Sequence, residues 1–177
     1  MMKNNEQGGD ALAALPFREI LLADFEFRQQ MGDPPSPVCL VARELRSGRE
    51  IILWRDELIA LRAAPFDTGK DSLFVAYAAA AELACMAALG WQAPLNVIDL
   101  FFEHRRETNG LLLPNGNGLL GALAYRGVPH IDHEHKEAMR QLIIGQNEWS
   151  DEERKAIIDY CRSDVDALAA LFEAMAP

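Results

Sequence analysis

Two carboxylates stand two residues apart near the start of the chain, at Asp24 and Glu26. They close an apolar stretch that predicts a buried strand over 19–27. Because side chains alternate between the two faces of a strand, both acids point to one face and Phe25 points to the other. Neighbouring carboxylates resist burial. Either the strand end reaches solvent, or a divalent cation binds between the acids, since hard cations take oxygen ligands.

A third carboxylate, Glu82, is the only charged residue between Asp71 and Asp99. The alanine content of 78–89 predicts a helix around it, with Gly90 as the stop signal. Glu82 is then either an exposed residue near the helix N-terminus, where the helix dipole favours negative charge, or a third acid directed toward the first two.

Tyr160 and Asp164 lie four residues apart in the last predicted helix and therefore share one of its faces. Ser150 and Glu153 form a capping box at the start of this helix. A tyrosine beside an acid can position a water molecule and help to deprotonate it. Alternatively, Tyr160 belongs to the apolar face of the helix and Asp164 to its polar margin.

The elements that must position these residues are predicted as one mixed sheet covered by helices, an α/β fold. Short turns join the first three strands into an antiparallel meander, and a strand–helix–strand unit follows. The predicted strands are 19–27, 38–45, 50–54, 72–77 and 96–100, the last extending toward 102. The predicted helices are 56–63, 78–89, 119–125, 136–144 and one that begins after Ser150.

With 177 residues, half of them apolar, the chain predicts one globular domain over 17–177, preceded by a disordered lead-in over 1–16. No apolar run is long enough to span a membrane, and no signal peptide is recognisable, so no membrane partner is expected. The three cysteines are far apart, which favours reduced thiols and a cytoplasmic location.

The formal net charge of −10 argues against binding nucleic acid through a broad basic face. It does not exclude a nucleic-acid enzyme whose acidic site is neutralised by bound metal.

In order and spacing, these residues resemble the motifs of the DEDD superfamily of 3′–5′ exonucleases. The resemblance is closest to the tyrosine subclass and to the proofreading exonuclease domains of family A and phage-type DNA polymerases. Asp24-Phe25-Glu26 matches the first motif, Asp-x-Glu. Residues 160–164, Tyr-Cys-Arg-Ser-Asp, match the third motif, Tyr-x-x-x-Asp. The resemblance spans about residues 18 to 175.

The second motif, His-Asn-x-x-Phe-Asp, is matched in spacing and predicted secondary structure rather than in residue types. Tyr77 and Ala78 fall on the His-Asn pair, and Glu82 falls on the aspartate. Glutamate reaches one methylene further than aspartate and can still bind a metal, with altered coordination. Asp99 is a second candidate for this ligand position, ranked below Glu82.

The resemblance implies a ribonuclease H-like five-stranded sheet and two divalent cations, Mg²⁺ or Mn²⁺. Asp24, Glu26, Glu82 and Asp164 would hold the cations, and Tyr160 would orient the attacking water. The implied activity releases nucleoside monophosphates from the 3′ end of single-stranded DNA or of a frayed primer terminus. A DNA polymerase domain in the parent chain is the implied partner.

Two other functions stay open. The altered second motif favours a docking or structural module with weak or no catalysis, and the same chemistry can also act on RNA. The sequence His-Ile-Asp-His-Glu-His over 130–135 is interpreted as a surface loop rather than a metal site.

Overall fold

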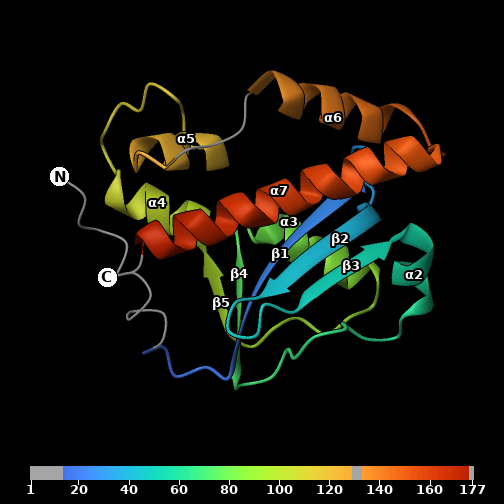
Figure 1. Ribbon diagram of the computed structural model, residues 1–177, viewed down its shortest axis with the longest axis horizontal. Coiled ribbons are helices and arrows are strands. Elements are labelled where there is room, and N and C mark those ends of the chain that lie inside the picture. Colours follow the sequence, from blue (N-terminus) through green and yellow to red (C-terminus); the bar gives the residue numbers. More distant parts are fainter. Residues whose placement is uncertain (1–13, 129–132, 176–177) are drawn as a thin grey trace.

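The computed structural model describes residues 14–128 and 133–175, apart from the side chains of 133–135. Five strands form one sheet in the order β3-β2-β1-β4-β5, and helices pack on both of its faces (Figure 1). The strands are β1 (Glu19–Arg28), β2 (Ser36–Glu44), β3 (Glu50–Trp54), β4 (Ser72–Ala76) and β5 (Val97–Asp99). The helices are α2 (Arg55–Ala60), α3 (Ala80–Ala88), α4 (Leu100–Glu107), α5 (Leu119–Tyr125), α6 (His133–Gly145) and α7 (Asp151–Met175).

The sheet is mixed, as the sequence predicts. β1 pairs with β2 and β2 with β3 in antiparallel fashion, whereas β1, β4 and β5 run parallel. The connections after β1 and β2 are too short for a crossover, so they join antiparallel neighbours. The longer connection through α2 allows β4 to run parallel to β1. The predicted α/β class, with three antiparallel strands followed by parallel ones, is confirmed.

The central strand β1 divides the core into two layers. Ile20 and Leu22 point into a cluster covered by α5 and α7, whereas Leu21, Ala23 and Phe25 point into a cluster covered by α2 and α3. This alternation continues the period of two, so Asp24 and Glu26 follow Leu22 toward α7. The long helix α7 crosses this face of the sheet (Figure 1).

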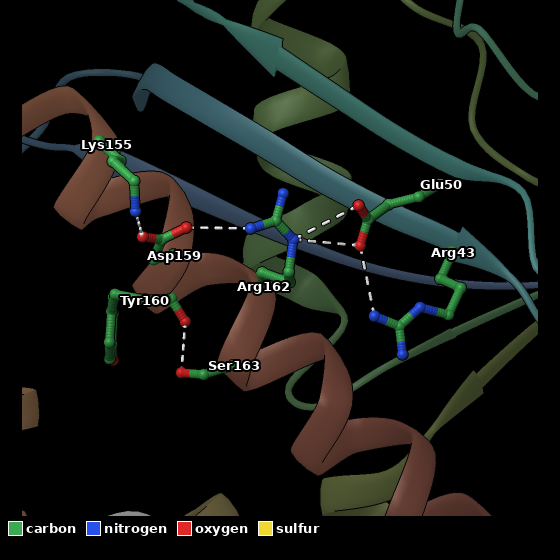
Figure 2. Close-up of polar contacts among 7 residues, drawn as sticks. All are labelled: Arg43, Glu50, Lys155, Asp159, Tyr160, Arg162 and Ser163. Atoms are coloured by element: carbon green, nitrogen blue, oxygen red, sulfur yellow. Dashed lines mark hydrogen bonds and ion pairs between the residues drawn. The ribbon is translucent and has the colours of Figure 1, made fainter. Parts of the chain in front are cut away.

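Charged side chains fix the position of α7 on the strands beneath it (Figure 2). Arg162 donates to both carboxylate oxygens of Glu50 on β3, at 3.3 Å each, and to Asp159 on its own helix at 2.9 Å. Arg43 on β2 donates to the same Glu50 at 3.3 Å. A network of several charges holds its geometry better than one exposed pair, so it fixes the turn of α7 that carries Tyr160.

The fifth strand is shorter than predicted, because a helix begins where the strand was expected to continue. The carboxylate of Asp99 accepts the N–H of Phe101 at 2.9 Å and so caps α4, which starts at Leu100. An aspartate that follows a short apolar strand can also be the N-cap of the next helix, and the sequence reading missed this alternative.

Three other boundaries can be compared with the sequence. The capping box of α7 is confirmed, since Ser150 and Glu153 each bind the other's backbone N–H, at 2.7 and 3.2 Å. Helix α6 begins at His133, so the loop interpretation is wrong for 133–135, whereas 130–132 lie outside the described residues. Of the expected lead-in, 1–13 likewise lie outside them. Leu15, within the expected lead-in, packs against the core, and its backbone oxygen accepts a hydrogen bond from Arg46.

Within the described ranges, no helix combines the length and the apolar character needed to cross a membrane.

Glu44 closes the β2–β3 turn and generates a stability prediction. Its carboxylate is 3% exposed and accepts four hydrogen bonds: from the N–H groups of Ile20, Arg46 and Ser47, and from the Ser47 hydroxyl. Burial raises the pKa of this carboxyl, but the four donors outweigh burial and lower the pKa from 4.5 to about 2.

The Glu44→Gln variant should lose about 2 kcal/mol of unfolding free energy at pH 7, because an amide nitrogen cannot accept. A lowered folded-state pKa stabilises above the unfolded value, so the difference from wild type should shrink as pH falls from 4.5 toward 2. Urea unfolding at several pH values measures this. Glu173→Gln, at an exposed helical position, is the control, and a pH-independent difference would contradict the assignment.

Candidate active site

A cavity of about 470 Å³ lies at the carboxyl end of β1. All five residues predicted as catalytic line it, although they come from three separate elements. β1 contributes Asp24 and Glu26, α3 contributes Glu82, and α7 contributes Tyr160 and Asp164. Residues up to 140 positions apart in the sequence therefore meet around one space.

Glu82 is held by the backbone of β1. Parallel pairing between β1 and β4 ends at Leu22 and Val75, and β4 itself ends at Ala76. Within the described residues, the next part of β1 therefore has no paired strand on that side. The N–H of Phe25 instead donates to Oε2 of Glu82 at 2.9 Å. Glu82 is only 4% exposed, so its alternative interpretation as a solvent-facing residue is wrong.

Asp24 is held by a residue that the sequence reading did not select. The thiol of Cys161 is fully buried and lies 3.2 Å from the backbone oxygen of Asp24 and 3.3 Å from its Oδ2. Ligand atoms of Asp24, Glu26 and Cys161 lie within 4.8 Å of one another. The sequence feature that could have identified Cys161 is its position inside the third motif, next to Tyr160.

Burial and mutual repulsion make the carboxylates of this site weak acids. Burial first, and the charge of Asp164 second, raise the pKa of Asp24 to about 7. The pKa of Glu26 and that of Glu82 are also raised well above the ordinary value, again by burial and then by the charge of Asp24. Positive charge placed near these acids would therefore stabilise their ionised forms.

Lys136 on α6 supplies part of that charge. Its Nζ lies 3.0 Å from Oδ2 of Asp164 and 5.8 Å from the centre of the Tyr160 ring. Burial, followed by the charge of Asp164, raises the pKa of Tyr160, so its hydroxyl keeps its proton at neutral pH. The sequence reading did not select Lys136, since nothing in the sequence around it distinguishes it from a surface lysine.

The residues present suit hard divalent cations such as Mg²⁺ or Mn²⁺. Carboxylate oxygens are the ligands such ions prefer. The pKa of Asp24 is raised first by burial and second by the charge of Asp164, and a bound cation would offset both effects. Asp24, Glu26, Glu82 and Asp164 would hold them. Glu82 can do so through the oxygen that Phe25 does not engage.

Asp99, the second candidate for the ligand position of Glu82, accepts hydrogen bonds from backbone N–H groups instead. Its two oxygens accept the N–H groups of Ala78, Ala79 and Phe101 at 2.9–3.0 Å. It does not line the cavity. These bonds hold Ala78 in a left-handed conformation, with φ of 62°, at the turn between β4 and α3.

No protein-family model matches the sequence, and no curated protein matches it. Solved structures do. The EXO domain of Nibbler from Aedes aegypti has a TM-score of 0.52 and 9% identity, covering 97% of this chain and 84% of that one. A nuclease solved in its apo form has a TM-score of 0.59 and 13% identity, with coverages of 98% and 76%.

RNase D from Escherichia coli, an exoribonuclease, has a TM-score of 0.51 and 13% identity, covering 99% of this chain. The chain spans 44% of RNase D, less than half its length. At these identities the likeness defines the fold, a ribonuclease H-like mixed sheet flanked by helices as in exonuclease domains. The fold predicted from the sequence is confirmed.

Glu82 generates the first prediction of the site. Glu82→Ala leaves the N–H of Phe25 without its partner and should lower the unfolding free energy by about 1–3 kcal/mol. Glu82→Gln keeps an accepting oxygen and removes one repelling charge, so it should unfold close to wild type. Thermal unfolding measures both. Equal losses in the two variants would show that the charge, rather than the hydrogen bond, is required.

Asp24 generates the second. At pH 8 without divalent cations, Asp24→Asn should raise the unfolding free energy by about 2 kcal/mol, because it removes a buried charge that its neighbours repel. Millimolar Mn²⁺ should raise the melting temperature of wild type and leave that of Asp24→Asn unchanged. Asp33→Asn, in an exposed loop, is the matched control and should respond to Mn²⁺ as wild type does.

Proposed function

We propose that this protein is a metal-dependent 3′–5′ exonuclease that releases nucleoside monophosphates. The observation that carries the proposal is the meeting of Asp24, Glu26, Glu82, Tyr160 and Asp164 around one cavity at the carboxyl end of β1. These residue types occur in the order and spacing of the exonuclease motifs. The fold likeness to a Nibbler EXO domain and to RNase D supports the same activity.

Each residue has a role that follows from its surroundings. The four carboxylates would hold two Mg²⁺ or Mn²⁺ ions, which would stabilise the negative charge that develops on the phosphate. Tyr160 orients the attacking water through its hydroxyl. Because its pKa is raised, Tyr160 acts as a hydrogen-bond donor rather than as a base. Cys161 and the N–H of Phe25 keep Asp24 and Glu82 in place.

The 3′ end of single-stranded DNA, including a frayed primer terminus, is the first substrate we propose. The proofreading part of a replicative DNA polymerase is the role that matches it. RNA is the second candidate, favoured by the likeness to an exoribonuclease. The three buried, free cysteines support a cytoplasmic location for either role.

A docking module without catalysis is the third candidate. It is favoured by the ion pair between Lys136 and Asp164, which satisfies one acid of the site without any metal.

The test is degradation of a 5′-labelled and a 3′-labelled strand of 20 nucleotides, as DNA and as RNA, with Mg²⁺, Mn²⁺ or chelator. Wild type should shorten the 5′-labelled strand stepwise with either metal and release a labelled mononucleotide first from the 3′-labelled strand. Asp24→Asn should be at least about 100-fold slower, while Asp33→Asn keeps full activity. Absence of shortening for both nucleic acids would favour the docking module.

A further inference from the structure

Helix α6 forms one wall of the cavity and contacts both β1 and α7. Four of its residues line the space: Lys136, Arg140, Ile143 and Ile144. Lys136 and Arg140 are one helical turn apart and therefore lie on the same face, about 6 Å apart along the helix axis. The two isoleucines continue this face by another turn. From its N-terminal end, α6 thus presents two positively charged side chains and then an apolar surface to the cavity.

These two residues are the cations of the cavity. Among the described residues that line it, four are carboxylates, and Lys136 and Arg140 are the positively charged ones. The whole chain carries a formal net charge of −10. A polyanionic strand that approaches this site is repelled by most of the molecule, so local cations must supply the attraction that bound metal does not.

Lys136 is placed to exchange one partner for another. Its ammonium group pairs with Asp164 at 3.0 Å, yet its side chain is 40% exposed, against 12% for Asp164. The ammonium group and a divalent cation would compete for the same carboxylate oxygen. With Asp164 serving as a metal ligand, the ammonium group would lose its closest acid and lie beside Tyr160, within reach of the space where a phosphate would lie.

Among the residues that the structure describes, Arg140 has only a distant acid, Glu137, as a partner. Its side chain is 65% exposed, and Oε1 of Glu137 lies 3.8 Å away, too far for a hydrogen bond. The guanidinium fork therefore keeps its donors for a ligand, and its planar geometry suits two phosphate oxygens. Ile144, 40% exposed, offers an apolar surface next to it.

We propose that α6 is the strand-binding helix of this protein, with Lys136 contacting the phosphate nearest the acids and Arg140 the next phosphate along the strand. The inference rests on the proposed function, because it assumes a nucleic-acid strand as the ligand. Ile144 then packs against a sugar or base of that strand. Lys136 is a positioning residue that holds the terminal phosphodiester beside Tyr160 and the carboxylates.

The test is binding of a 5′-fluorescein-labelled single strand of 12 nucleotides, as DNA and as RNA, followed by fluorescence anisotropy. Ca²⁺ replaces Mg²⁺ so that the strand stays intact. Lys136→Met and Arg140→Met should each weaken binding about tenfold at low salt and reduce the slope of log K against log salt by about 0.7. Lys136→Arg should retain most of the affinity.

Lys70→Met and Arg18→Met are matched controls. They remove the same charges from exposed positions just before β4 and β1, at the amino ends of these strands and therefore at the opposite end of β1 from the cavity. Equal weakening in all four methionine variants would overturn the proposal, since only net charge would then matter. Unchanged binding by Lys136→Met would also overturn it and would limit Lys136 to neutralising Asp164.

Titration of Mn²⁺ by calorimetry distinguishes strand binding from a merely structural role. Lys136→Met should bind Mn²⁺ at least as tightly as wild type, because a competitor for Asp164 is gone. Weaker binding of both Mn²⁺ and the strand would show a damaged site and overturn the proposal. The proposed function fails separately: a wild type that binds the strand through α6 but never shortens it supports this inference and refutes the nuclease.

Discussion

The site depends on a difference in length between two parallel strands. β1 continues past the last residue of β4, and beyond Leu22 its backbone lacks a strand on that side. A buried N–H without a partner is costly, and the carboxylate of Glu82 removes that cost at Phe25. The same hydrogen bond brings α3 against β1 and sets a third acid beside Asp24. The need of one buried N–H group for an acceptor therefore brings the acids of the site together.

The acids stay close together because rigid elements hold them. Buried carboxylates repel one another, and the pKa values of Asp24 and Glu82 are raised first by burial and then by that repulsion. β1 cannot move, since it is the central strand of the sheet, and Arg162 ties α7 to Glu50 on β3 (Figure 2). The fold thus keeps an electrostatically unfavourable arrangement in place, as sites prepared for a cation commonly do.

Sequence reasoning predicted the five strands, most of the helices and the five residues that line the cavity, because their signals are local. The period of two in β1, the capping box of α7 and the spacing of Tyr160 and Asp164 need no knowledge of distant contacts. α4 was missed because the Asp99 cap resembles the polar end of a strand. Cys161, Lys136 and the partner of Glu82 were missed because contacts between residues 28 to 137 positions apart define them.

The left-handed turn at Ala78 bears on which residue types this position can hold. With φ of 62°, this position favours glycine or asparagine over other residues, since a β-carbon is crowded there. Glycine or asparagine at this position would therefore adopt the same turn with less strain. Here Asp99 holds the turn by accepting the N–H groups of Ala78 and Ala79, so an alanine can occupy the left-handed position. A side chain on the following strand thereby supplies the conformational constraint that glycine or asparagine would otherwise provide.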